Sequence, residues 1–433
     1  MKYRHVLAIP FVALLVILPG ALAKLWSVSV TEALTGFTTT TYSEDAPEST
    51  LNTIVSNGFS DSQTFLNDQS VFQEEDGVDK GLGPTFNARA CVDCHQNPVT
   101  GGASQVSVRR VGHMSGGQFV NPNITINDGQ TVIASRSLVN DRAICPQAQE
   151  RVPQSENIRT FRMSLNTLGD GYVESIADST LQALAQQQRA LTRGRIAGEA
   201  IQVPIAENPG QTRVGRFGWK DQQASLLSFA SDAYLNEQGI TNRLNPNDVT
   251  TLCQTTTGVE DGPDSNGLDD IDHQAHFMRG TMAPPVDSNL MGTADAQAGQ
   301  QIFMQIGCAF CHTTSITTAA PGTVLVNAAG NNGFTVPDAL GNKIIHPFSD
   351  FLLHDVGTGD GIVQNGPPDT ANKLRTPPLW GLRTHNRYMH DGLSATVQNA
   401  IQRHDGEADF VTRRFQGLTQ RQKNQLVTFL NSL

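Results

Sequence analysis

Short amphipathic segments, separated by polar and glycine-rich stretches, form the hydrophobic pattern of this chain. Residues 296–306 place Ile302, Phe303 and Ile306 on one side, as a short helix just before Cys308 would. Near the end, Leu418 and the Thr419-to-Gln422 stretch supply a staple residue and a capping box. Apolar residues then recur at helical spacing: Leu426, Phe429, Leu430 and Leu433. The pattern predicts two helices that enclose the last part of the chain.

The first half is less regular. Asp178-Ser-Thr180, followed by Leu181, Leu184 and Leu191, predicts a capped helix that ends at Gly194. Residues 121–131 and 145–157 are typical of loops or short strands. Because aromatic residues make up only 6% of the chain and glycine is plentiful, we expect long loops around compact helical cores, a mainly α fold.

The first residues predict export. Lys2 and Arg4 precede an apolar run over residues 6–18, and Ala21-Leu22-Ala23 offers a small-residue cleavage site. The alternative is a membrane anchor, but the run has about 13 residues where a spanning helix needs about 20. We therefore expect a signal peptide, residues 1–23, cleaved near Ala23, a periplasmic protein, and no membrane span after cleavage.

Chain length and charge further limit the number of domains and the kinds of partner that we expect. The roughly 410 residues left after cleavage exceed one small domain, and we expect an N-terminal domain over 24–285 with insertions and a C-terminal domain over 286–433. The chain carries 30 Lys and Arg against 41 Asp and Glu, and its basic residues are scattered. This distribution argues against nucleic acid as a partner.

Four of the six cysteines lie in two Cys-x-x-Cys-His segments, Cys91-Val-Asp-Cys94-His95 and Cys308-Ala-Phe-Cys311-His312. Haem c needs two thiols to add to the porphyrin vinyl groups, and a histidine on the next residue to ligate the iron. A zinc site, a thioredoxin-like dithiol or local disulfides would not need that histidine. We therefore predict two covalently bound haem c groups with His95 and His312 as iron ligands. Cys145 and Cys253 remain as the candidates for one disulfide.

Further segments resemble the bacterial di-haem peroxidase superfamily, which includes cytochrome c peroxidases and MauG-like enzymes. The resemblance is greatest to its di-haem oxidoreductase branch, also called thiol oxidoreductases. The matching stretches span residues 81 to 408: Gly81-Leu-Gly-Pro-Thr-Phe86-Asn87, Gly215-Arg-Phe-Gly-Trp219-Lys, Leu352-Leu-His354-Asp355-Val-Gly357, Leu374-Arg375-Thr-Pro-Pro378-Leu-Trp380-Gly381, Tyr388-Met-His390-Asp-Gly392 and His404-Asp-Gly-Glu407-Ala408.

The resemblance implies two class I cytochrome c-like haem domains. One haem would accept electrons and the other would bind peroxide. In the peroxidases the second ligand of the C-terminal haem follows the histidine of the Tyr-x-His-x-Gly motif by fourteen residues, which here gives His404. A histidine there implies a bis-histidine haem of lower potential than a His/Met haem. The alternative is a loop histidine. His390, Arg375, Trp380 and His354 with Asp355 would be structural or support this haem.

The second ligand of the N-terminal haem is open. The peroxidases take it from a loop histidine less than 20 residues past the motif, and His113 fits that distance from His95. Met114 is an alternative, an open five-coordinate iron is another, and His113 can equally be a surface loop residue.

The resemblance to the peroxidases implies two candidate catalytic residues. Trp219 falls where the peroxidases carry an aromatic residue between the haems, and Glu237-Gln-Gly239 resembles their Glu-x-Gly at the peroxide pocket. A carboxyl group there could move a proton between peroxide oxygens; otherwise Glu237 is a solvated residue in a turn. Family members also bind calcium between domains, so the acidic run Asp261 to Asp270 is either a linker or a calcium site.

Together these features predict a di-haem c-type oxidoreductase that reduces hydrogen peroxide with electrons from a small cytochrome c or a cupredoxin. One alternative is an electron carrier without catalysis. The other is MauG-like oxidation of a protein or organic substrate, which a tyrosine at position 404 would have favoured.

Overall fold

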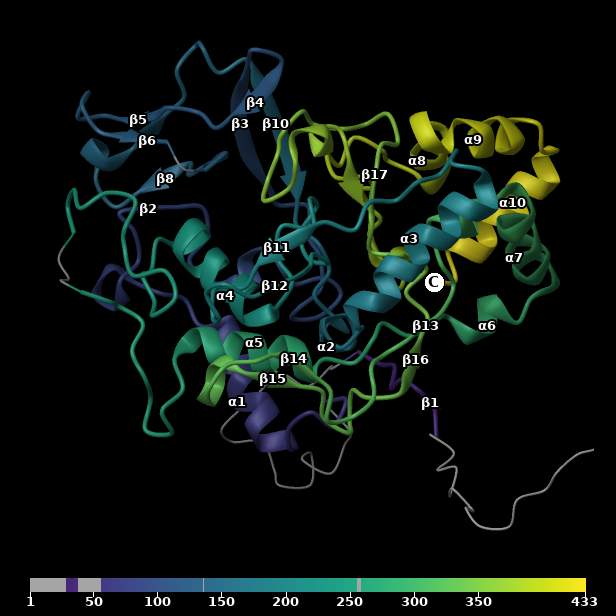
Figure 1. Cartoon of the computed structure of the whole chain (residues 1–433), viewed down its shortest axis with the longest axis horizontal. Helices are drawn as coiled ribbons and strands as arrows, with labels where there is room; N and C mark the ends of the chain where they lie inside the picture. The colour runs from purple at the N-terminus through teal and green to yellow at the C-terminus, as the bar shows by residue number, and fades with distance from the viewer. Residues whose placement is uncertain (1–28, 38–55, 135, 255–257) are drawn as a thin grey trace, which may run out of the picture.

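The computed structural model describes residues 29–37, 56–134, 136–254 and 258–433 (Figure 1). The predicted signal peptide lies outside the described residues. The helices are α1 Ser62–Gln73, α2 Asp170–Glu174, α3 Asp178–Thr192, α4 Leu226–Ala233, α5 Asp270–Gly280, α6 Ser288–Met291, α7 Ala294–Ile306, α8 Val397–Gln402, α9 Asp409–Gln416 and α10 Gln420–Leu430.

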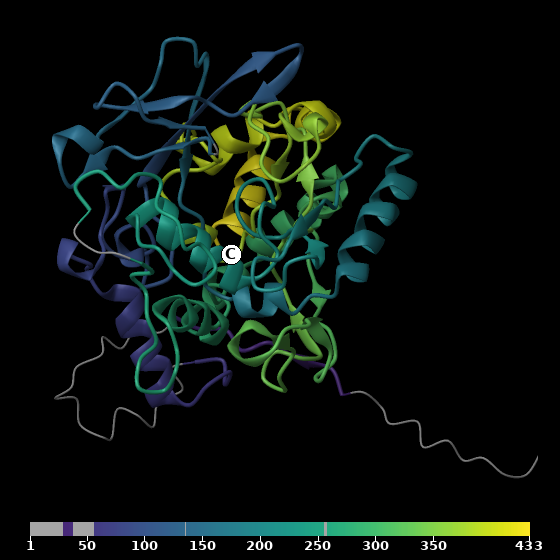
Figure 2. The same cartoon turned by 60° about the vertical axis from the view of Figure 1, so that its left-hand side comes forward.

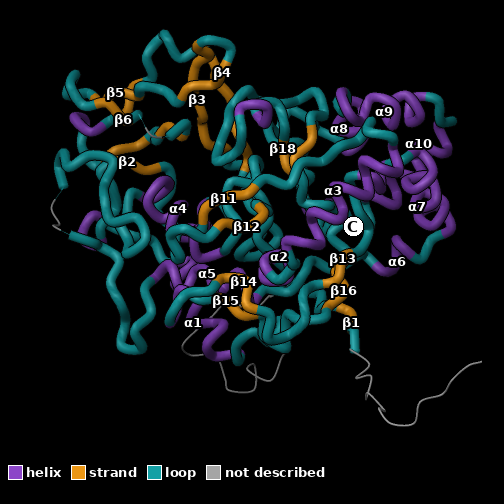
Figure 3. The backbone as a smooth tube through the Cα atoms, in the orientation of Figure 1, coloured by secondary structure: helices purple, strands orange, loops and turns teal. Residues whose placement is uncertain are grey.

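Many short strands accompany these helices, and long loops connect them (Figure 3). The strands are β1 Thr31–Glu32, β2 Thr85–Phe86, β3 Ser107–Ser115, β4 Gln118–Val120, β5 Ile124–Ile126, β6 Val132–Ile133, β7 Leu138–Val139, β8 Arg142–Ala143, β9 Glu150–Arg151, β10 Ile158–Met163, β11 Gln202–Pro204, β12 Thr212–Val214, β13 Ile316–Thr317, β14 Val324–Val326, β15 Phe334–Thr335, β16 Lys343–Ile345, β17 Leu353–His354 and β18 Leu374–Arg375.

The expectation of a mainly α chain is wrong. Helices account for 32% of the structure and strands for 17%. The largest antiparallel pair joins β3 and β10, from Gly112 opposite Ile158 to Ser107 opposite Met163, and β4 and β7 extend it. Valine and isoleucine side chains on strands nearby form a small apolar core of their own: Val111, Ile124, Ile126, Ile133 and Val139. Strand pairing between segments that are distant in the sequence therefore determined this part of the fold more than the glycine-rich, polar composition did.

Two larger cores hold the rest of the chain together. The first packs α1 against α5, where Phe277 lies 5.4 Å from Phe65 and 4.7 Å from Phe72 between ring centroids. It also includes apolar residues from 316–353 and Trp380, so it draws on both sides of the predicted boundary at residue 285. The second lies between α7, α8, α9 and α10. The division into two domains stays a prediction.

Helices α7 and α10 form as predicted. They pack closely on each other, at the right in Figure 1, and Figure 2 shows the same helices after a turn of the view. Thr419 and Gln422 make the predicted capping box of α10. Gly299 allows the close approach, because a Cβ there would lie 2.0 Å from the carbonyl oxygen of Gln425. The contact fixes the end of α7, and with it the cysteine motif that follows.

The remaining two cysteines, Cys145 and Cys253, form a disulfide across 108 residues, which confirms that prediction. It ties the strand-rich part of the chain to the loop before α5. No helix among the described residues is long and apolar enough to cross a membrane.

Candidate di-haem site

The C-terminal cysteine motif begins where α7 ends. Gly307 closes that helix in the left-handed conformation, with a φ of 102°. The short 3₁₀ turn η6, Cys308–Phe310, then presents Cys308, Cys311 and His312 on the same side as the second core. Burial raises the pKa of Cys308 to about 12 and also raises that of Cys311, so both sulfurs are protonated thiols near neutral pH.

Two histidines meet at this motif, and both are held in the same manner. The Nδ1 atom of His312 donates to the carbonyl of Phe348 at 2.8 Å, and that of His404 donates to the carbonyl of Ala400 at 2.8 Å. A carbonyl at Nδ1 leaves Nε2 free with a lone pair, the arrangement typical of metal-ligating histidines. Burial, together with the nearby His404, lowers the pKa of His312 to about 4, which keeps the ring neutral as iron ligation requires.

The two rings line one cavity of about 210 Å³ together with Cys308 and Cys311. Most of its other lining side chains are apolar, among them Phe303, Leu379, Leu382, Val397, Ile401 and Val411. An apolar cleft lined by two thiols and by an imidazole from each of two segments fits a haem c with two histidine ligands. The residues present therefore suit the cofactor that the sequence predicts here.

His404 is delivered to the cavity by α8 and the turn that follows. Thr396 caps α8 by accepting a hydrogen bond from Asn399 N. After the helix, the backbone nitrogens of Asp405 and Glu407 donate to Val356 and Asp355, each at 2.9 Å. Two of the resembling segments, around His354 and around His404, are thus in direct contact.

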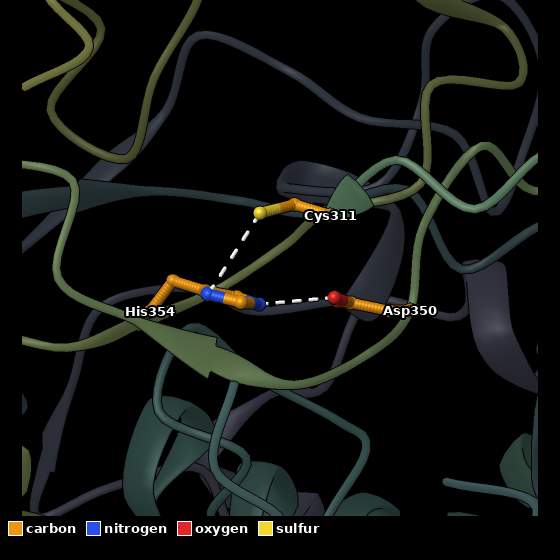
Figure 4. A group of neighbouring side chains, drawn as sticks. All are labelled: Cys311, Asp350 and His354. Carbon is orange, nitrogen blue, oxygen red and sulfur yellow. Dashed lines mark hydrogen bonds and ion pairs between the residues drawn. The ribbon is translucent and has the colours of Figure 1, made fainter. Parts of the chain in front are cut away.

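A buried charged cluster supports this turn (Figure 4). His354 Nε2 lies 2.9 Å from an Asp350 oxygen, and its Nδ1 lies 2.9 Å from Glu407 and 3.8 Å from Cys311 Sγ. Burial opposes a charged imidazole, but Cys311, then Asp350, and the hydrogen bonds of both to the ring outweigh it, so the pKa of His354 is raised. The ion pair between His354 and Glu407 holds the turn around Glu407 against the core.

Cys311, Asp350 and His354 also place three possible metal-ligand atoms within 4.8 Å of one another, and among the described residues no other such group occurs. A thioether at Cys311 would remove the thiolate that a metal needs, so we interpret the cluster as the support of the His404 turn. The acidic run Asp261 to Asp270, which we interpreted as a linker or a calcium site, does not gather such a group among its described residues. Asp261 instead accepts hydrogen bonds from the backbone nitrogens of Asp270 and Ile271 at the start of α5.

The N-terminal motif lies on another short turn, η3 Cys91–Asp93, which begins just after Ala90. Asp93 Oδ2 accepts from the nitrogens of Arg89 and Ala90, which fixes the turn. Phe72 packs edge-on against the His95 ring at 6.2 Å. The Nδ1 atom of His95 is buried and has no hydrogen-bond partner among the described residues. A buried imidazole beside two thiols fits a second haem site.

Glu237 lies beside this motif, on the π-helical turn Tyr234–Gln238. Its side chain accepts from Asn87 Nδ2 at 2.8 Å, and its carbonyl accepts from Asn87 N at 2.7 Å. Gly239 ends the turn with a φ of 78°, and a Cβ there would lie 2.7 Å from the Thr85 carbonyl. Burial, followed by the Glu237 carboxylate, raises the pKa of Cys94 to about 12. Burial likewise raises the pKa of Glu237, although Asn87 opposes the shift.

The structure places Trp219 at the C-terminal cavity, and its position between the two haems stays a prediction. It lines the C-terminal cavity, its Nε1 donates to the carbonyl of Met163 at 2.8 Å, and its ring lies 6.1 Å from that of His390. Arg375 and His390 line the same cavity. Trp380 is buried in the first core.

His113 lies on β3, and the structure brings it together with Glu156, whose carboxylate is 2.7 Å from Nδ1. Its role as a haem ligand stays a prediction. Sequence reasoning also missed several contacts: Phe348 as the partner of His312, Glu407 as the partner of His354, and Gln238, whose side-chain amide lies 3.7 Å from Cys91 Sγ. In the structure, Phe348 has a positive φ of 50°, which is uncommon for a bulky residue.

A family model described as "Di-haem oxidoreductase, putative peroxidase" matches residues 140–433. The chain belongs to this di-haem oxidoreductase family. The family implies haem cofactors and an oxidoreductase function. The matched residues include the motif at Cys308 and begin after the motif at Cys91.

Two solved structures that the chain resembles are distant from it in sequence. Hydrazine synthase of Kuenenia stuttgartiensis shares 14% identity over 94% of this chain and 99% of that chain, with a TM-score of 0.38. A MauG-like protein associated with microbial copper homeostasis shares 21% identity over 38% of this chain and 52% of that chain, with a TM-score of 0.24. Scores this low carry no argument about this chain. No curated protein matches it.

Proposed function

We propose that this protein is a periplasmic di-haem c-type peroxidase, which reduces hydrogen peroxide to water with electrons from a small cytochrome c or a cupredoxin. The observation that carries the proposal is the difference between the two cysteine motifs. The C-terminal cavity has a candidate ligand on each side, His312 and His404, both held through Nδ1. The N-terminal motif has His95 and, close by, a half-buried carboxyl group on Glu237.

The residues divide accordingly. Cys308 and Cys311 would hold one haem covalently, with His312 and His404 as its iron ligands, and Cys91, Cys94 and His95 would hold the other. His113 is the candidate sixth ligand of the second haem. When bound, the haems supply one-electron chemistry and, at an open iron, a place for peroxide.

Glu237 would supply the proton transfer. Reduction of peroxide requires a proton to move from the inner to the outer oxygen as the bond between them breaks. A carboxyl group whose pKa is raised by burial holds a proton nearer to neutral pH than an exposed one. Asn87, which donates to Glu237 Oε2, fixes the orientation of the carboxyl group.

Electron entry is favoured on the C-terminal side. A polar cavity of about 770 Å³ adjoins the haem cavity there and shares His390 and His404 with it. Its wall carries Arg159, Arg403 and Arg413 together with Asp391, Asp405 and Asp409, so it presents charges of both signs to a small redox protein.

The test is the spin state and ligand binding of the purified holo-protein, fully oxidised and half-reduced, followed by peroxide consumption with a reduced small cytochrome c. We expect one haem to become high-spin and to bind peroxide or cyanide. Glu237→Gln should then lower peroxide turnover while leaving cyanide binding intact. If both haems remain low-spin and neither binds peroxide, cyanide or carbon monoxide, the protein is an electron carrier.

A further inference from the structure

One short segment, residues 163–166, contacts both candidate haem sites. Residues 163–166 follow strand β10, which lies beside β3 on the side of the molecule that faces β17 (Figure 1). All four residues line the C-terminal cavity. On its other side the segment contacts the N-terminal motif, because Ser164 bonds to Cys94 and the Leu165 backbone approaches the His95 ring.

The hydroxyl of Ser164 makes the closest link. Its oxygen accepts from Ser104 N at 2.9 Å, and it lies 2.8 Å from the carbonyl oxygen of Cys94. Since Ser104 N can only donate, the single hydroxyl hydrogen is available for a carbonyl. The Cys94 carbonyl is the nearest acceptor, at 2.8 Å, against 3.2 Å for Ser104 Oγ and 3.4 Å for the Ser104 carbonyl. Ser164 therefore donates to the haem-attachment residue Cys94.

The preceding peptide group completes a route to the other site. The Met163 carbonyl, joined directly to Ser164 N, accepts from Trp219 Nε1 at 2.8 Å, and Met163 N donates to the His390 carbonyl at 2.8 Å. Two hydrogen bonds, the covalent bonds of Ser164 and the Met163 carbonyl group thus connect Cys94 with Trp219, which lines the C-terminal cavity.

We propose that the segment of residues 163–166 is the electron bridge between the two haem sites, and that the Ser164 hydroxyl is its positioning group at Cys94. This inference rests on the proposed di-haem function. The segment passes one electron at a time, so one haem is oxidised by one electron as the other is reduced by one. No bond forms or breaks in the bridge, and Ser164 keeps its proton. Two such transfers, with two protons, match the reduction of one hydrogen peroxide to two waters.

The test uses the full-length holo-protein and the variant Ser164→Ala. A substoichiometric pulse of reductant places one electron on the protein, and its redistribution between the haems is followed by absorbance. Redox titration gives both reduction potentials. We expect redistribution several-fold slower than in the wild type, with both potentials and the oxidised spectra unchanged. Ser164→Thr, which retains the hydroxyl, should restore the rate.

Ser104→Ala is the matched control, because it removes the hydroxyl that lies 3.2 Å from Ser164 Oγ but keeps the Ser104 backbone donor and the Ser164 bond to Cys94. It should behave as the wild type. Trp219→Phe removes the second hydrogen bond of the route and should also slow redistribution; it replaces Ser164→Ala as the test if that variant does not take up both haems. A wild-type rate in the loaded variant, or equal slowing in Ser104→Ala, overturns the bridge.

Peroxide consumption is measured separately on the same samples. If the wild type consumes no peroxide but its electron redistribution depends on Ser164, the peroxidase proposal fails and the bridge stands. If peroxide is consumed and redistribution does not depend on Ser164, the bridge fails and the peroxidase stands.

Discussion

Glu407→Gln tests whether the buried ion pair with His354 holds the turn that carries His404. Glu407 Oε2 lies 2.9 Å from His354 Nδ1 and also accepts from Ala197 N at 2.8 Å. The Glu407 side chain is 18% exposed and that of His354 is 2% exposed, so water can replace little of the ion pair when it is removed. Removing one partner of a buried pair costs about 3–5 kcal/mol. Asp350 remains on His354, and glutamine can still accept one backbone hydrogen bond. We therefore expect a loss of about 1–3 kcal/mol.

The pH dependence of this loss follows from the two pKa shifts. The pKa of Glu407 is lowered from 4.5, so its contribution is present above pH 4.5 and is lost as pH falls through the folded value. The pKa of His354 is raised from 6.5, so its contribution is complete below pH 6.5 and declines as pH rises toward the folded value. The difference between wild type and variant should therefore be largest between pH 4.5 and 6.5.

Urea unfolding of the holo-protein, at pH values inside and above that window, measures the loss. Glu199→Gln is the control, because Glu199 pairs with Lys373 at side-chain exposures of 28% and 22%, where a pair is worth about 0–1 kcal/mol. The low-spin absorbance of the C-terminal haem is a second readout and should weaken in Glu407→Gln. A loss no larger than that of the control, or one independent of pH, refutes the reasoning.

Three further predictions concern other parts of the chain. His404→Gly should turn the C-terminal haem high-spin, and an unchanged absorption and resonance spectrum would show that the ligand is another residue. Replacing both Cys145 and Cys253 by serine should lower the free energy of unfolding by about 2–5 kcal/mol in urea titrations under oxidising conditions, because the bond closes a long loop; equal stability with and without the bond would contradict this. The pKa of Asp261 is raised by burial from 3.8 to about 7, so the unfolded chain ionises first and wild-type stability should fall as pH rises across that range. Asp261→Asn should flatten this slope in unfolding titrations, and parallel curves would disprove the assignment.

The sequence predicted the parts of the fold that depend on local patterns. Periodic apolar residues and a capping box located α7 and α10, and the spacing of Cys308 to His312 identified the motif between them. The strands outside residues 121–131 and 145–157 were missed, because most are short and many pair with segments distant in the sequence. Ser107–Ser115 pairs with Ile158–Met163 more than forty residues later, and neither alternates strongly enough to stand out.

Single contacts at the site were harder to predict. Ser164 is an ordinary serine in the sequence, and its role arises only because β10 ends against the loop after His95. Glu407 and His354 were both noticed as parts of motifs, but their pairing depends on a turn and a buried strand end that no local pattern specifies. The partner of His113, Glu156, likewise comes from a separate loop.

The resembling segments, each weak alone, gain their meaning from where they meet. Asn87 of the first segment binds Glu237 beside the N-terminal motif, and Arg375 N donates to the Trp219 carbonyl beside the C-terminal cavity. These contacts sort the segments into two groups, one around each cysteine motif. The segment of residues 163–166 belongs to neither group and touches both. If the haems occupy these two sites, that segment is a bonded connection between them, and the rate of electron exchange should depend on it more than on either group alone.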